Sequence, residues 1–121
     1  DYRYVWIRDS SFTAQALFHV GHIKESQDFR RWMRGIVSKT KDPSLIRIMY
    51  GLNGEVDLKE QILSNLSGYR NSSPVRIGND AAKQRQLDIY GELLNSVYDT
   101  TRHGEDIPHK NWIIIRRIVD Y

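Results

Sequence analysis

The first nine residues, DYRYVWIRD, carry the side chains best suited to chemistry on a ligand. Four of them occupy every second position: Tyr2, Tyr4, Trp6 and Arg8. An extended backbone would place these four on one side, because strand side chains alternate between faces. Aromatic rings stack on the apolar faces of sugars, while Arg8 and Asp9 offer a donor and an acceptor to hydroxyl groups. The pattern favours carbohydrate binding; the alternative is an aromatic core strand followed by Asp9 as a helix cap.

Two glycine-containing loops supply further polar groups, at residues 50–55 and 74–80. Hydrolysis of a glycosidic bond needs two carboxyl groups, one to protonate the leaving oxygen and one to activate water or attack. Glu55, Asp57 and Asp80 are the candidates by position. Carboxylates beside turns are more commonly solvated or capping, so the pattern alone gives none of the three a catalytic role.

Composition excludes several classes of protein. The chain has 121 residues, and 18 basic minus 15 acidic residues leaves a net charge of +3, too small to indicate a nucleic-acid partner. It has no cysteine and no apolar run near the ~20 residues that a membrane-spanning helix needs. His19 and His22 are separated by a glycine and lack a carboxylate at ligand spacing, so no metal and no cofactor is predicted. The compartment stays open, with the cytoplasm slightly favoured.

Hydrophobic periodicity predicts a predominantly helical, all-α chain. The clearest stripe includes Phe29, Trp32, Met33 and Ile36, at the spacing of an amphipathic helix. Short connections favour antiparallel helical hairpins. The predicted helices cover residues 9–20 with a cap among Asp9, Ser10 and Ser11 and a stop at Gly21, 24–40, 57–66, 80–103 with Asp80 as cap, and a last helix after Pro108; residues 45–50 fit a short strand and 67–79 a long loop.

Four strings together resemble glycoside hydrolase family 15, in its prokaryotic glucoamylase-like and trehalase branch. They are DYRYVWIRD at 1–9, IMYGLNGE at 48–55, GYRNSSPVRIGNDA at 68–81 and QLDIYGE at 86–92. The resemblance implies an (α/α)6 barrel around a pocket for one glucose unit. The predicted fold is therefore a partial (α/α)6 barrel of helical hairpins with long loops and a short strand pair. We expect residues 1–121 to be an N-terminal part of that catalytic domain, cut at both ends.

The resemblance also implies which residues bind substrate. Tyr2 and Trp6 match aromatic residues lining the innermost glucose subsite, and Arg8 with Asp9 match the pair that grips the distal hydroxyls of that glucose. Arg76 and Asn79 match further positions facing the pocket. Val5 stands where the family pattern has a cysteine, a small apolar replacement that concerns packing.

The general-acid and general-base glutamates of the family lie outside these residues, so the resemblance implies no catalytic residue in this chain. The resulting prediction is a segment of an inverting, exo-acting α-glucosidase of glucoamylase type that releases glucose from α-glucans or maltooligosaccharides. The alternatives are a trehalase acting on trehalose, and a non-catalytic regulatory or scaffold protein of the same fold. Because a partial barrel leaves edges open, we expect self-association, with the apolar run 112–115 at an edge.

Overall fold

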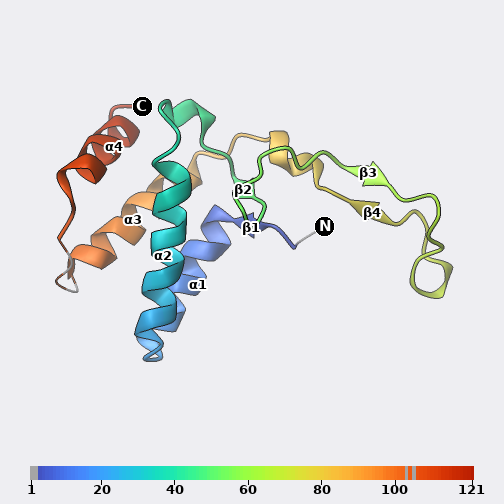
Figure 1. Cartoon of the computed structure of the whole chain (residues 1–121), viewed down its shortest axis with the longest axis horizontal. Coiled ribbons are helices and arrows are strands. Elements are labelled where there is room, and N and C mark those ends of the chain that lie inside the picture. The colour runs from blue at the N-terminus through green and yellow to red at the C-terminus, as the bar shows by residue number, and fades with distance from the viewer. Residues whose placement is uncertain (1–2, 103, 105) are drawn as a thin grey trace.

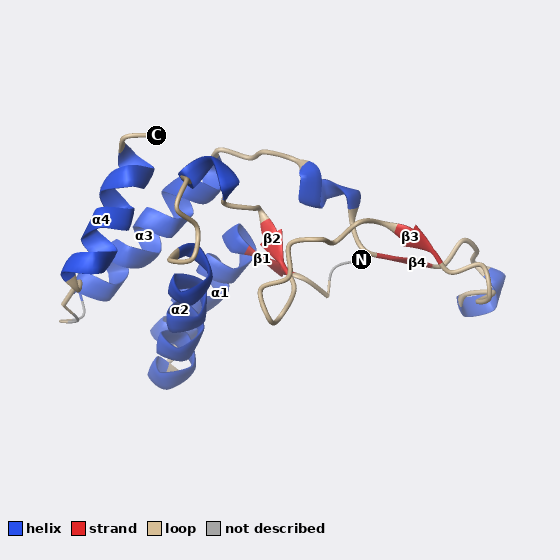
Figure 2. Cartoon of the chain, turned by 45° about the horizontal axis from the view of Figure 1, so that its top comes forward, coloured by secondary structure: helices blue, strands red, loops and turns tan. Residues whose placement is uncertain are grey.

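The computed structural model describes residues 3–102, 104 and 106–121, and helices dominate it (Figure 1, Figure 2). The predominantly all-α prediction is confirmed. Two short antiparallel strand pairs accompany the helices, where a single pair was expected. The elements are β1 (Val5–Trp6), α1 (Ile7–His19), α2 (Ile23–Val37), η1 (Pro43–Leu45), β2 (Met49–Tyr50), β3 (Gln61–Ile62), η2 (Tyr69–Asn71), β4 (Arg76–Ile77), η3 (Asp80–Lys83), α3 (Asp88–Arg102) and α4 (His109–Val119).

Helix α1 begins earlier than the sequence indicated. Trp6, in extended conformation, precedes the first helical residue and gives no side-chain cap. The expected caps at Asp9, Ser10 and Ser11 are wrong, because all three lie inside the helix. The Ser11 hydroxyl instead donates to the Ile7 carbonyl at 2.9 Å, a hydrogen bond to the preceding turn. The helix ends at His19, and Gly21 makes the turn with φ +89°, as expected for a stop.

The hairpin of α1 and α2 is fixed by apolar packing and by buried polar contacts, the shorter of which comes from Ser26. Met33, Ile36 and Val37 of α2 are buried, which confirms the amphipathic stripe. Ser26 is fully buried, and its hydroxyl donates to the Ala14 carbonyl of α1 at 2.6 Å. A small serine lets the two helices approach closely, and its buried hydroxyl still has a hydrogen-bond partner.

Helices α1 and α3 lie side by side and run in the same direction. Arg8 contacts Asp88 at the start of both helices, and Gln15 contacts Asp99 further along both. Helices α2 and α4 run back in the opposite direction (Figure 1). Two parallel helices, each followed by a returning one, form a layered arrangement in which the starts of α1 and α3 lie at one end.

One helix prediction was wrong, and another was wrong in part. Residues 57–66 form no helix; β3 pairs there with β4, and the Leu63 amide donates to the Val75 carbonyl at 2.8 Å. The predicted helix 80–103 divides into η3, an extended stretch from Gln84, and α3 beginning at Asp88. Asn79 caps η3 in place of Asp80. His103, the predicted end, lies outside the described residues.

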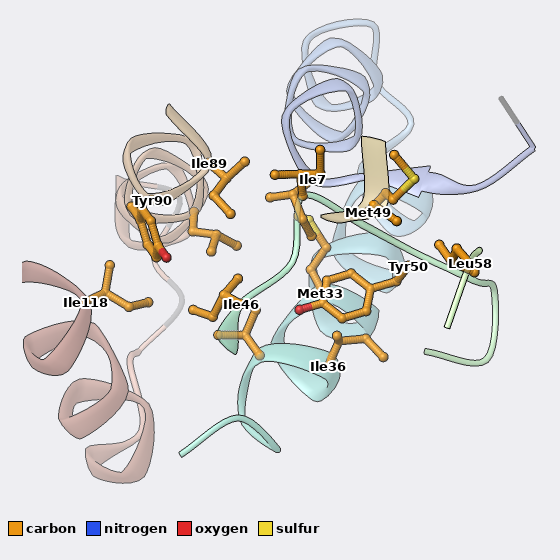
Figure 3. Close-up of a cluster of buried hydrophobic side chains, with 14 residues drawn as sticks. Ile7, Met33, Ile36, Ile46, Met49, Tyr50, Leu58, Ile89, Tyr90 and Ile118 are labelled. Atoms are coloured by element: carbon orange, nitrogen blue, oxygen red, sulfur yellow. The ribbon is translucent and has the colours of Figure 1, made fainter. Parts of the chain in front are cut away.

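The buried cluster joins α1, α2, α3, α4 and the strand β2 (Figure 3). Its most buried members include Ile7, Ile48, Met49 and Ile89. Around this cluster the molecule is open: the chain exposes 8265 Å², against about 6,800 Å² for a compact monomer of 14.2 kDa. An arm, residues 57–79 with β3 and β4, projects from the helices (Figure 1).

Candidate functional site

The candidate site lies where β1 passes into α1. Trp6 pairs with Met49 across the β1–β2 ladder, and the Ile7 amide donates to the Ile48 carbonyl at 2.9 Å. These bonds fix the backbone immediately before Arg8 and Asp9. Because the strand ends at Trp6, the expected alternation stops there, and Arg8 projects from the first turn of a helix. Tyr2, another predicted site residue, lies outside the described residues.

Arg8 is held by the segment that begins α3. Its Nη1 donates to Asp88 Oδ2 at 2.5 Å and to Gln86 Oε1 at 3.2 Å. The side chains of Arg8 and Asp88 are 38% and 43% exposed, so the pair remains accessible to a ligand. The hydrogen bond and charge of Asp88 raise the pKa of Arg8 above its usual value, with smaller contributions from Asp9 and Glu92. The guanidinium is therefore a permanent cation among three carboxylates.

Asp9 is exposed in the first turn of α1, next to Arg8. A negative charge there is stabilised by the positive end of the helix dipole. Within the described part of the chain, its carboxylate makes neither a hydrogen bond nor an ion pair. Its oxygens can therefore accept hydrogen bonds from ligand hydroxyls while Arg8 donates, which is the chemistry the sequence pattern suggested.

Tyr4 connects the arm to this site, a role that no pattern in the sequence indicated. Its hydroxyl accepts a hydrogen bond from the Gly78 amide at 3.0 Å, across 74 residues of sequence. Gly78 has φ +78°, and an added Cβ would lie 2.1 Å from the Lys59 carbonyl oxygen. Only glycine fits this close approach of two backbones.

Asn79 and Arg76 both take part in internal contacts of the loop and arm. The Asn79 amide donates to the Leu58 carbonyl at 2.7 Å, and its side-chain oxygen accepts from the Ala81 amide at 3.0 Å. Arg76, half exposed on β4, pairs through Nε with Glu60 at 3.1 Å. The Tyr4–Gly78 bond thus places Asn79 beside the segment that enters α1, whereas the Arg76–Glu60 ion pair lies within the arm.

The carboxyl groups of the glycine-containing loops have the wrong electrostatics for a general acid. Glu55 accepts hydrogen bonds from the Asn53 side chain at 2.8 Å and the Asn53 amide at 3.0 Å, which lower its pKa. Asp80 pairs with Lys83 at 2.9 Å, which lowers its pKa as well. A general acid near neutral pH needs a raised pKa, so we assign Glu55 and Asp80 to stabilising the local backbone around them.

A separate cavity of about 70 Å³ lies between α2, α3 and α4. Its wall is mainly apolar and includes Met33, Val37, Leu93, Val97, Ile114 and Ile118. Such a lining offers a sugar few hydrogen bonds, so we place the candidate site at Arg8 and Asp9.

Across residues 3–102, 104 and 106–121, no group of three or more histidine, cysteine, aspartate or glutamate side chains could hold a metal ion. No helix in these residues is long and apolar enough to span a membrane.

The structure is predominantly helical, and comparison with known proteins identifies the family of the chain. The chain belongs to glycosyl hydrolases family 15, whose family model matches residues 1–121. Its layered helices agree with part of the helical barrel expected from the sequence. No solved structure matches the chain.

Several curated trehalases are similar to the chain over its whole length. The trehalase of Mycolicibacterium smegmatis is 42% identical over 99% of the chain, and that of Mycobacterium tuberculosis is 40% identical over 99%. Trehalase 1 of Sulfolobus acidocaldarius is 39% identical over the full chain. The chain covers 18%, 18% and 22% of these relatives, about a fifth of their length.

Proposed function

We propose that the polypeptide carrying this chain is a trehalase, a glycoside hydrolase that cleaves trehalose into two glucose molecules. The similarity to trehalases across the whole chain carries the proposal. It favours trehalase, the alternative in the sequence analysis, over the glucoamylase-type exo-glucosidase given there first. Residues 1–121 would form an N-terminal part of the helical barrel, and the catalytic glutamates would come from other parts of the polypeptide.

In this proposal the chain supplies part of the pocket for one glucose unit. Asp9 accepts hydrogen bonds from sugar hydroxyls, Arg8 donates to them, and Trp6 presents an aromatic surface to the sugar ring. Asn79 would extend the wall near the start of α1, and Arg76 would approach from the arm; Tyr2 is included in the proposal on the family resemblance alone. Charged hydrogen bonds give the strongest orientation of a neutral sugar, which supports assigning the main grip to Arg8 and Asp9.

The first experiment is a glucose-release assay on the purified full-length polypeptide with trehalose, maltose and maltooligosaccharides. We expect trehalose to be the preferred substrate. Inversion would give one β-glucose and one α-glucose for each trehalose, because only the carbon attacked by water changes configuration. Proton NMR of the first products measures this ratio. A preference for maltooligosaccharides would instead support the hypothesis of a glucoamylase-type exo-glucosidase. If no α-glucoside were hydrolysed, the hypothesis of a non-catalytic scaffold protein would be favoured.

The second experiment tests the proposed sugar contact. Asp9→Asn removes the charge of the acceptor, and we expect kcat/KM for trehalose to fall at least about tenfold. Asp28→Asn is the matched control, since Asp28 is an exposed helical carboxylate paired with Lys24 and Arg31 on α2. An unchanged kcat/KM in Asp9→Asn would remove Asp9 from the pocket.

A further inference from the structure

The Arg8 side chain is hydrogen-bonded to two residues at and just before the start of α3. Asp88 and Gln86 are about 80 positions away in sequence, yet both accept hydrogen bonds from the same nitrogen, Nη1. Among the described residues, no hydrogen bond involves Nε or Nη2 of Arg8. One edge of the guanidinium is thus fixed by protein, and its other donors are left for a ligand.

This pair does little to hold the two helices together. Both side chains are more than a third exposed, and exposed ion pairs contribute between nothing and about 1 kcal/mol to stability. The buried cluster that includes Ile7 and Ile89 already packs the starts of α1 and α3. What the contact does restrict is the orientation of a long side chain with many rotamers.

We propose that Asp88, assisted by Gln86, is a positioning residue that holds the Arg8 guanidinium in the orientation that binds the glucose unit. The assignment rests on the proposed function. A guanidinium already ordered before the sugar arrives loses less side-chain entropy on binding. Asp88 touches Arg8 and need not touch the sugar, so its effect passes entirely through Arg8.

Another role for Asp88 would give similar single-variant data. Asp88 opens α3, where a carboxylate interacts favourably with the helix dipole whether or not Arg8 is present. Asp9 and Glu92 also lie near enough to influence Arg8, so it keeps carboxylate neighbours when Asp88 is neutralised. The two roles separate in a double-variant cycle, because a dipole effect persists without the Arg8 guanidinium and a positioning effect does not.

The experiment uses the full-length polypeptide, because the chain spans about a fifth of the trehalases it resembles. Asp88→Ala, Asp88→Asn and Gln86→Ala are made alone and in an Arg8→Lys background, with Asp28→Asn as control. KM and kcat for trehalose, inhibition by glucose and the unfolding temperature are measured. We expect Asp88→Ala to raise KM and the inhibition constant of glucose about tenfold, with a smaller change in kcat and little change in unfolding temperature.

Asp88→Asn keeps an acceptor for Nη1, so it should restore part of the affinity lost in Asp88→Ala. In the Arg8→Lys background, removing Asp88 should change KM less than twofold. Equal effects in both backgrounds, or a KM within twofold of wild type in Asp88→Ala and Gln86→Ala, would overturn the assignment. If Asp88→Ala does not fold, Asp88→Asn and Gln86→Ala decide alone. A wild-type polypeptide that neither cleaves trehalose nor binds glucose would instead overturn the proposed function, and the assignment with it.

Discussion

Replacing Gly78 by alanine tests how the arm is joined to the site. The Cβ added at φ +78° would lie 2.1 Å from the Lys59 carbonyl oxygen and 2.8 Å from the Glu60 Cα. Both neighbours are backbone atoms, so no side-chain rotation relieves the overlap. The adjoining hydrogen bonds, from the Gly78 amide to Tyr4 and from the Asn79 amide to the Leu58 carbonyl, must lengthen or break.

The cost follows from the conformation and the overlap. A left-handed backbone costs a residue with a Cβ roughly 1–2 kcal/mol, and displacing two backbone segments adds to that cost. At about 2 kcal/mol, the population in which the Asn79–Leu58 bond is open rises about 30-fold. Hydrogen exchange of the Asn79 amide in the full-length polypeptide measures this increase directly.

The matched control is Gly35→Ala, at a helical glycine of α2 with open space around the added Cβ. There the substitution should stabilise α2 by about 0.5–1 kcal/mol, because alanine loses less entropy than glycine in a helix. The two variants therefore have opposite signs. Unchanged exchange of the Asn79 amide in Gly78→Ala would refute the close approach of the two backbones.

Three further predictions concern other contacts. Glu55→Gln should retain activity. Hydrogen bonds from Asn53 lower the pKa of Glu55, so the ionised carboxylate stabilises its turn at neutral pH. This stabilisation is lost as the pH falls through the folded-state pKa of Glu55, which an NMR titration measures. Arg30→Met should destabilise the polypeptide by about 3 kcal/mol, because it leaves the largely buried Asp99 without its cation, and adding Asp99→Leu should recover part of the unfolding temperature. The isolated 121-residue chain should associate in sedimentation runs through apolar surface that includes Trp112, which is 53% exposed. Trp112→Glu should weaken this association. A monomer at every concentration would contradict the prediction.

Sequence reasoning succeeded where local pattern decides structure. The stripe of α2 and the glycine turn after α1 are local features, and the structure has both. It failed where distant contacts decide. Residues 80–87 include good helix formers, but Gln84 leaves the helix with ψ 156°, and Gln86 then bonds to Arg8. No local signal distinguishes that break from a continuing helix.

The arm shows the same limit. Leu58, Ile62 and Leu66 have helical spacing, yet the chain forms β3 there because residues 75–77 offer a pairing strand. Of the candidate site, Arg8 and Asp9 could be proposed from the sequence, because the aromatic and charged pattern around them is continuous, and their role stays a prediction. Its partner Asp88 could not, because only the folded chain brings the start of α3 to the start of α1.

The contacts between α1 and α3 explain why a site can form at one end of these helices. Apolar side chains such as Ile7 and Ile89 bury the helix starts, while Arg8–Asp88 and Gln15–Asp99 form polar contacts along the same pair of helices. A seam of apolar residues alone would close over and exclude a hydrated sugar. Polar side chains that are already paired keep the end accessible to water and sugar at little cost in stability. The helix packing therefore fixes the backbone, and the polar contacts fix which donors and acceptors the proposed site presents.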